Sequence, residues 1–306
     1  MTQSVDYYVL TQLLLDDIYF PTGESKLNQL GGGTYTVAGM RIWSDRVGFC
    51  CAPGCDYEGN YDKWFLDNQI CISGGRREKN CTHARLNYFP DGEREEILLP
   101  GCATHRESQP LVSEIPPEYR DCRGMYFFKD CEQPFWDELL PFLTHGSAIS
   151  CWEIFGASAC PQNRDFIGDV LHHIDLFSLN LTEGRRLTGL SEPLDIVKAL
   201  RDMNAGNFIF RMGANGAIAA SPQKLYHIPA VATNVVDVTG GGNSSTGGFT
   251  VGFCETDGDI LEAGLCAAVA SSFIIEQYGV PANIDDHLMQ QARQRRDALR
   301  TLVKPL

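Results

Sequence analysis

The sequence predicts an α/β fold built on a mostly parallel central sheet. Short apolar runs that suit buried strands alternate with helical patterns, and this order is typical of strand–helix–strand units. No internal repeat, low-complexity tract or long linker divides the 306 residues. Because this length is normal for one large α/β domain, we expect a single domain over residues 1–306.

The expected elements follow one another along the chain. The apolar run 9–15 predicts the opening strand, and residues 34–44, which follow a glycine turn, predict the first helix. Further strands are expected at 47–52, 148–152, 176–179 and 207–212. Helical patterns between and after them lie at 164–173, 193–204, 260–278 and 285–303.

Residues 81–99 have a different pattern. Two strand-like runs, 84–89 and 93–99, flank Pro90-Asp91-Gly92, and an Asp-Gly pair between such runs indicates a hairpin. We expect an antiparallel flap outside the main sheet. Leu86 and Tyr88 are the candidates for its apolar side.

The composition narrows the classes of partner. The formal net charge is −14 and the pI is about 4.9, so the chain is poorly suited to nucleic acids or anionic membranes. No apolar stretch approaches the length of a membrane span, and no basic segment precedes an apolar start. We therefore expect a cytoplasmic protein with no nucleic-acid or membrane partner.

The 12 cysteines do not form Cys-x-x-Cys pairs, which favours scattered reduced thiols. Cys50, Cys51, Cys55, Cys81 and His83 leave a zinc site as a minor alternative, because their spacing is looser than that of known zinc motifs.

The most informative segment is a glycine-rich turn that runs from Asp237 to Asn243 and opens into an apolar stretch. Gly240, Gly241 and Gly242 let a ligand approach the backbone closely. The N–H groups that begin the following helix would then point at negative charge, so this turn predicts an anion-binding site.

Polar residues and glycines at other strand ends extend the candidate site. Asp16 and Asp17 follow the opening strand, where a carboxylate can accept hydrogen bonds from sugar hydroxyls. Gly31 and Gly32 lie at a loop-to-helix junction. Each of these features also has a plain structural interpretation as a surface turn.

Two further turns follow predicted strands. Asn180 and Glu183, three residues apart, either hold Mg²⁺ waters and phosphates or form an ordinary helix cap. Arg211, Gly213 and Gly216 either border a nucleotide or form a hairpin turn.

In order and spacing, these motifs resemble the ribokinase (PfkB) family of carbohydrate and nucleoside kinases, over nearly the whole chain. Asp237 to Asn243 is similar to the family signature Asp-x-Thr-Gly-x-Gly-Asp, Gly31-Gly32 to its di-glycine motif, and Asn180 with Glu183 to its Asn-x-x-Glu motif. The pattern most resembles a divergent fungal branch named for killer maintenance. The resemblance implies a three-layer sandwich with a small β lid, formed from about 18–30 and 81–99 with its tip at Gly92-Glu93-Arg94.

The resemblance also implies roles for the residues. The catalytic set would be Gly240, Gly241, Gly242 and Asn243; the substrate set Asp16, Asp17, Gly31, Gly32 and Thr36; and the cofactor set Asn180, Glu183, Arg211, Gly213 and Gly216. ATP and Mg²⁺ would be the cofactors, with Glu183 reaching the metal through water. A sugar or nucleoside would be the substrate, and a homodimer would form through the lid.

Three residues depart from the family pattern. Asn243 stands where the family has its general base Asp, Thr36 stands where it has an Asn, and Arg211 stands where it has a Thr. Three departures together argue against one engineered substitution. Asn243 cannot take a proton as a carboxylate does, and the hypothesis is that Asp16 or Asp17 takes it where the acceptor hydroxyl lies close. The leading hypothesis is ATP-dependent phosphotransfer to a hydroxyl. The alternatives are a pseudokinase that binds ligands or scaffolds partners, and a lyase or hydrolase in the inherited pocket.

Overall fold

A computed structural model describes residues 5–57, 61–90, 94–101, 104–144 and 146–306. Within these ranges, ten strands form the central sheet in the order β14-β13-β12-β11-β10-β9-β8-β1-β4-β5. The strands are β1 (Tyr7–Leu10), β4 (Val47–Cys50), β5 (Cys71–Ser73), β8 (Gly124–Lys129), β9 (Ile149–Ile154), β10 (Leu176–Asn180), β11 (Asn207–Arg211), β12 (Ala217–Ala220), β13 (Leu225–Ile228) and β14 (Lys304–Pro305). Pairing is parallel from β5 to β11 and antiparallel from β11 to β14, so the prediction of a largely parallel sheet is confirmed.

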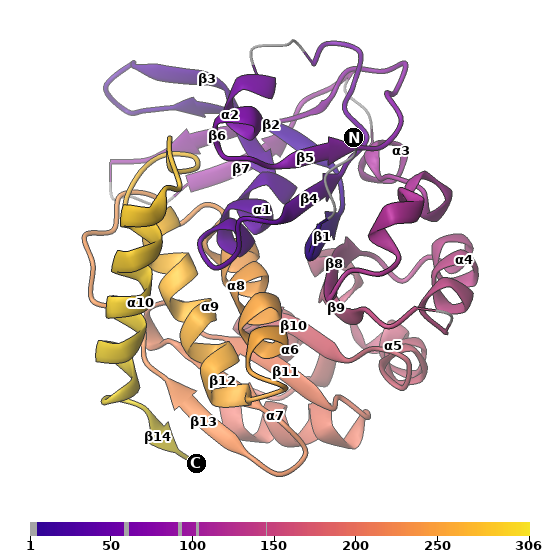
Figure 1. Cartoon of the computed structure of the whole chain (residues 1–306), viewed down its shortest axis with the longest axis vertical. Helices are drawn as coiled ribbons and strands as arrows, with labels where there is room; N and C mark the ends of the chain where they lie inside the picture. The colour runs from indigo at the N-terminus through magenta and orange to yellow at the C-terminus, as the bar shows by residue number, and fades with distance from the viewer. Residues whose placement is uncertain (1–4, 58–60, 91–93, 102–103, 145) are drawn as a thin grey trace.

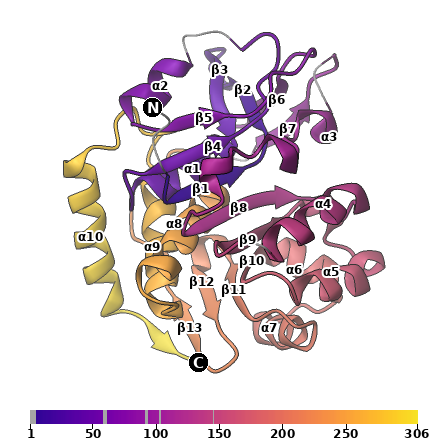
Figure 2. The same cartoon turned by 45° about the vertical axis from the view of Figure 1, so that its right-hand side comes forward.

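Helices cover both faces of this sheet (Figures 1 and 2). One face carries α1 (Gly33–Arg41), α8 (Gly241–Glu255), α9 (Ile260–Ile274) and α10 (Asp286–Arg300). The other carries α4 (Gln133–Thr144), α5 (Arg164–Leu171), α6 (Leu181–Thr188) and α7 (Pro193–Asp202). Two separate buried apolar clusters lie between the sheet and these helices, one on each face, as a three-layer α/β sandwich requires.

Short elements complete the chain. They are α2 (Asp62–Asp67), α3 (His105–Ser108) and the single 3₁₀ turns η1 (Val112–Glu114), η2 (Pro117–Tyr119), η3 (Gly156–Ser158), η4 (Pro161–Asn163) and η5 (Gly213–Asn215). Among the described helices, none combines the length and the apolar character needed to cross a bilayer.

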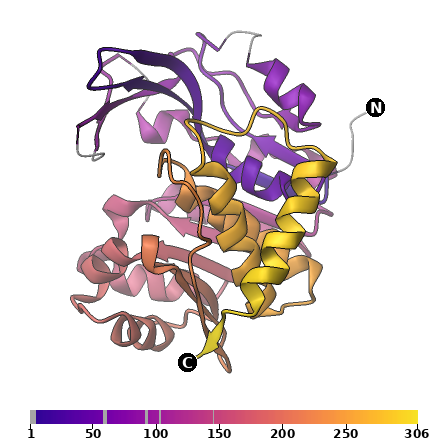
Figure 3. The same ribbon diagram turned by 90° about the vertical axis from the view of Figure 1, so that its left-hand side faces the viewer.

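Four strands within the described ranges form a second sheet, which we call the small sheet: β3 (Ser25–Gly32), β2 (Leu13–Tyr19), β6 (Thr82–Tyr88) and β7 (Arg94–Leu98), in that order. It lies at one end of the molecule, above the central sheet (Figure 3). β6 and β7 pair antiparallel, as the hairpin prediction required. Of the predicted tip Gly92-Glu93-Arg94, Gly92 and Glu93 lie outside the described residues, as does Asp91 of the predicted turn, and Arg94 begins β7.

The predicted opening strand 9–15 is wrong. The chain leaves the central sheet after β1 and enters the small sheet at β2, and the break is at Thr11 and Gln12. The Thr11 N–H donates to the Cys50 carbonyl 3.3 Å away, while the Gln12 carbonyl accepts from Gly33 N–H at 3.2 Å. The apolar run hides this change of sheet because the side chains on both sides of the break are buried.

Glycines in α8 allow three helices to pack closely, although glycine lowers helix propensity. A Cβ on Gly247 would collide with the Thr36 carbonyl of α1, and one on Gly248 would press on the Cys266 carbonyl of α9. α1 contacts α8 as well as β2 and β3 of the small sheet, so this layer places the beginning of α8 near the small sheet, where the candidate site lies.

Candidate active site

The glycine turn begins a helix, as predicted. Gly240 has φ of 75° and caps α8, whose first residues are Gly241, Gly242 and Asn243. A side chain at Gly240 would be strained by this positive φ and would collide with the ring of Tyr35. The first turn of a helix leaves N–H groups without intrahelical partners, so this turn has the local geometry of an anion cradle.

Asp237 shapes the approach to the turn. Its Oδ1 accepts from the Thr239 N–H at 2.8 Å and from the Thr239 hydroxyl at 2.6 Å. The Tyr88 hydroxyl, from β6, donates to the same oxygen in a short hydrogen bond. The other carboxylate oxygen, Oδ2, is buried and has no hydrogen-bond partner within the described residues. Asp237 thus links the glycine turn to the small sheet.

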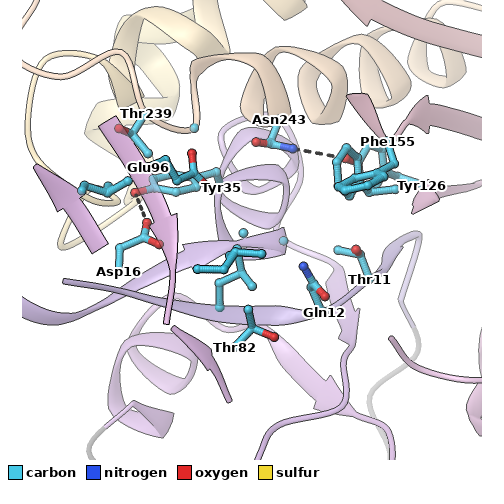
Figure 4. Close-up of a pocket in the computed structure, with 17 residues that line it drawn as sticks. Thr11, Gln12, Asp16, Tyr35, Thr82, Glu96, Tyr126, Phe155, Thr239 and Asn243 are labelled. Carbon is cyan, nitrogen blue, oxygen red and sulfur yellow. Dashed lines mark hydrogen bonds between the residues drawn. The ribbon is translucent and has the colours of Figure 1, made fainter. Parts of the chain in front are cut away.

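A cavity of about 390 Å³ lies between the small sheet and the beginning of α8 (Figure 4). Within the described ranges its polar lining comes from Thr11, Gln12, Asp16, Tyr35, Thr82, Glu96, Tyr126, Thr239 and Asn243. Its apolar lining comes from Leu14, Leu86, Leu98, Phe128 and Phe155, with Gly32, Gly33 and Gly240 at the backbone. The volume falls in the range of small-molecule sites.

The two predicted aspartates separate in the structure. Asp16 lies within β2 and lines the cavity, where its Oδ2 accepts from the Tyr35 hydroxyl at 3.3 Å. Asp17 is the next residue on the strand and points to the opposite face. There its carboxylate accepts from the Asn28 N–H at 2.8 Å and lies 3.7 Å from the His83 ring. The position predicted for these aspartates, at the end of the first strand, was wrong because the chain breaks earlier.

The di-glycine segment lies at the end of β3. Gly31 packs against the Asp16 carboxylate so closely that a Cβ there would collide with it, and Gly32 has φ of 56° and lines the cavity. Thr36, the next predicted contact, is buried in α1 and lies outside the set of described residues that line the cavity. Its backbone carbonyl lies against Gly247, at the close contact between α1 and α8.

Asn180 and Glu183 form a capping box at the beginning of α6. The Asn180 side chain accepts from the Glu183 N–H at 2.9 Å, and the Glu183 carboxylate accepts from the Asn180 N–H at 2.7 Å. Burial raises the pKa of Glu183, and the nearby charge of Arg211 opposes this effect. The ordinary helix-cap interpretation is therefore satisfied, and Glu183 also lies 4.0 Å from the Arg211 guanidinium.

Arg211 ends β11 and is almost fully buried. Its Nη2 forms an ion pair of 2.7 Å with Glu153 Oε1. Burial alone would lower the pKa of Arg211, but the charges of Glu153 and Glu183 outweigh it and raise that pKa, so the guanidinium stays charged. Gly213 and Gly216, with φ of 59° and 78°, turn the chain from β11 into the antiparallel strand β12, which fits the hairpin interpretation.

Sequence reasoning missed a network that connects Arg211 to the cavity. Glu153 at the end of β9 accepts from the Tyr126 hydroxyl at 2.9 Å, and Tyr126 accepts from the Asn243 amide at 3.5 Å. Burial first, then the Glu153 charge, raises the pKa of Tyr126, so its hydroxyl remains protonated. Glu96 of β7, a second cavity carboxylate, was also missed. The sequence signal for Glu153 is its place directly after the predicted strand 148–152.

The described residues contain no side-chain cluster that matches the zinc alternative. Among the described residues, no group of three or more His, Cys, Asp or Glu side chains is placed to hold a metal ion. The Cys55 thiol donates to Asn80, and Cys81 accepts from the Gly54 N–H at 3.2 Å. His83 lies between Asp17 and Asp56.

Comparison with known proteins places this geometry in a family. Residues 155–287 match the model of the pfkB family carbohydrate kinases. Protein MAK32 of Saccharomyces cerevisiae is 35% identical, over 82% of this chain and 78% of its own. Aminoimidazole riboside kinase of Salmonella typhimurium is 26% identical, over 75% of both chains.

A solved ribokinase-like protein of Escherichia coli, in complex with ATP and Mg²⁺, superposes with a TM-score of 0.75 at 15% identity and covers 95% of this chain and 99% of its own. This likeness shows that the fold is the ribokinase-like α/β fold expected from the sequence. The chain is a divergent member of the pfkB (ribokinase) family of carbohydrate kinases, related to Protein MAK32.

Proposed function

We propose that this protein transfers a phosphoryl group from ATP to a hydroxyl of a small molecule of the sugar or nucleoside class. One observation carries the proposal: the glycine turn of α8 and the carboxylate of Asp16 line the same cavity (Figure 4). Phosphoryl transfer needs an anion site and an oriented acceptor at one place, and it needs little other protein chemistry.

The backbone at the beginning of α8 would stabilise the phosphate. Bound ATP supplies the group that is transferred, together with a good leaving group. The N–H groups near Gly242 and Asn243 belong to the first helical turn, so they and the helix dipole favour negative charge in a partly enclosed site. Tyr35 packs against Gly240 and holds the turn in position.

Asp16 would orient the acceptor. Its hydrogen bond with the Tyr35 hydroxyl is long, at 3.3 Å, so a substrate hydroxyl can compete for the carboxylate. Leu14, Leu86 and Phe155 give the cavity a mostly apolar wall. Such a wall favours a substrate with a flat apolar ring over a bare sugar, because apolar contact contributes binding energy only to the former. The relative that acts on aminoimidazole riboside supports this choice.

The proton of the acceptor hydroxyl needs a base other than Asn243. Asp16 and Glu96 are the carboxylates among the described cavity residues, whereas Asp17 faces away. We assign the proton to Asp16, because it is the buried carboxylate and the one that would already contact the hydroxyl.

Mg²⁺ would accompany the nucleotide, held mainly by phosphate oxygens and water. The side chains of the chain do not fit direct coordination of the metal. Arg211 lies beside the carboxylates of Glu153 and Glu183, and the Glu183 oxygen nearest to Arg211 already caps α6. Glu183 would thus reach the metal through water at most. The likeness to the ATP- and Mg²⁺-bound protein supports this cofactor pair.

The small sheet would act as a lid. It supplies one wall of the cavity, and Tyr88 ties it to Asp237 beside the glycine turn.

Leu27, Phe89 and Ile97 are exposed on this sheet or its edge, and we propose that they form the contact of a homodimer. Sedimentation of the wild-type protein and of Ile97→Asp tests this contact.

ADP formation with a panel of sugars and nucleosides tests the proposed function. We expect nucleosides to stimulate ADP formation, and Asp16→Asn to reduce kcat by about 10²–10⁴-fold if Asp16 takes the proton. Asp17→Asn is the matched control on the opposite face of β2 and should leave kcat unchanged. Bound but intact ATP with every acceptor would favour a pseudokinase, and turnover of a ligand without nucleotide would favour a lyase or hydrolase.

A further inference from the structure

The guanidinium of Arg211 lies against the first turn of α8. A Cβ on Gly242 would overlap its Nη1 atom, so glycine at this position leaves room for a cation beside the turn. The contact joins the end of β11 to the predicted anion cradle, although the two are separated by about thirty residues of chain. A guanidinium, paired with the Glu153 carboxylate, therefore lies at the place where negative charge would bind.

The arginine is held in one orientation. The Glu153 carboxylate forms an ion pair of 2.7 Å with the Arg211 Nη2 atom. The Tyr126 hydroxyl donates a hydrogen bond of 2.9 Å to the same carboxylate. Tyr126 in turn contacts Asn243, which lines the cavity. The network thus runs from the cavity to the guanidinium through side chains from four separate elements.

The guanidinium has donor capacity left over. Its Nε is buried and has no hydrogen-bond partner within the described residues, which is unfavourable in a folded protein. The carboxylate of Glu183, at 4.0 Å, is too distant for a hydrogen bond. The guanidinium nitrogen beside the helix N-terminus is Nη1, the atom that a Cβ on Gly242 would meet, and it is the donor suited to an oxygen of an incoming anion.

We propose that Arg211 is a ligand of the phosphate group bound at the glycine turn, and that it lets the chain bind a polyphosphate without a divalent metal. The proposal rests on the proposed function, because it concerns the same phosphate site. A planar guanidinium carries several donors and matches phosphate oxygens better than the single ammonium of lysine does. The competing interpretation is purely structural, with Arg211 neutralising Glu153 and Glu183.

Calorimetry with ATP and with pyrophosphate, both in EDTA, tests the proposal. Because Arg211→Met alone would leave a buried unpaired carboxylate, the main variant is the double substitution Arg211→Met with Glu153→Gln. We expect the wild type to bind both probes in EDTA and the double variant to bind them roughly 10- to 100-fold more weakly. Arg211→Lys should fall between them.

Two comparisons separate binding from folding. Gly242→Ala should displace the guanidinium and weaken binding to a similar extent while Arg211 itself remains. Arg295→Met is the matched control. Arg295 lies on the distant helix α10 and also forms an ion pair with a glutamate, Glu276, at 2.9 Å. This variant should leave binding unchanged. Thermal unfolding of each variant identifies those that fold.

The outcomes distinguish this inference from the proposed function. A folded double variant that binds both probes as tightly as the wild type overturns the role of Arg211, whether or not the protein phosphorylates an acceptor. A wild type that binds neither probe in EDTA also overturns it. Arg211-dependent pyrophosphate binding in a protein that phosphorylates no acceptor supports the anion site and refutes the kinase.

Discussion

Replacing Asn243 by aspartate, Asn243→Asp, restores a carboxylate where the chain has an amide. The change is nearly isosteric and its structural cost is small. The hydrogen bond that it removes, from the Asn243 amide to Tyr126, is 3.5 Å long, so its loss should cost less than about 1 kcal/mol. The new charge lies in the first turn of α8, where the helix dipole returns about 0.3–1 kcal/mol. The variant should therefore fold with nearly unchanged stability.

The expected effect is on turnover. A positioned general base contributes about 10²–10⁴-fold, which corresponds to about 3–5 kcal/mol of barrier. Initial rates of ADP formation with the best acceptor of the panel measure it, and ATP affinity should change little. Asn163→Asp is the matched control, since Asn163 lies in η4 and outside the lining of the cavity within the described residues.

A folded Asn243→Asp variant that binds ATP normally and shows no gain in turnover would refute this reasoning. It would mean that the acceptor hydroxyl does not lie within reach of position 243. The same gain in the Asn163→Asp control would also refute it, because the effect would then come from net charge alone.

Three further predictions concern stability. Gly240→Ala places a methyl group at a positive φ against an aromatic ring and should lower the free energy of unfolding by about 1–3 kcal/mol in chemical denaturation; an unchanged value would contradict the packing described. Tyr88→Phe removes the hydrogen bond to Asp237 and should speed proteolysis within the small sheet relative to the rest of the chain; equal cleavage rates would argue against the link. Burial alone would raise the pKa of Glu114, but the hydrogen bonds and charge of Arg77, together with backbone hydrogen bonds from Leu111 and Gly75, outweigh it and hold that pKa below its usual value. The contribution of Glu114 to the free energy of unfolding is therefore present above the unfolded pKa of about 4.5 and lost as pH falls through the folded pKa. The stability difference between wild type and Glu114→Gln should shrink from pH 7 to pH 3. A constant difference would contradict the ion pair.

Local signals in the sequence were sufficient for part of the fold. The glycine turn that begins α8, the helix after Gly32 and the Asp-Gly hairpin of β6 and β7 each depend on backbone preferences of a few adjacent residues. Parallel strands such as β10 and β11 are short apolar runs, which composition detects directly. These elements lie within a few residues of their predicted bounds.

Other features depend on contacts that are remote in sequence. Thr11 and Gln12 are a polar pair within the apolar run, but such a pair does not by itself indicate that the chain changes sheets, because apolar residues continue on both sides. As a result Asp16 and Asp17, predicted at a strand end, lie within β2 on opposite faces of the small sheet. The fold class was unaffected, since the central sheet needs only the residues of β1.

The hydrogen-bond and ion-pair network of the site could not be predicted from the sequence, for the same reason. Glu153 and Arg211 are adjacent only because β9, β10 and β11 lie side by side, and Tyr126 joins them from β8. Strand order cannot be deduced from the apolar pattern of each strand alone. The departure at Arg211 was visible in the sequence, but its pairing with Glu153 required the topology.

The measurement that tests the central claim most directly is mass spectrometry of the acceptor itself, after incubation of the wild-type protein with ATP, Mg²⁺ and the sugar and nucleoside panel. We expect a phosphorylated acceptor that disappears in the Asp16→Asn variant and persists in Asp17→Asn. ATP that stays intact with every acceptor, or ADP formed without any phosphorylated acceptor, would contradict it.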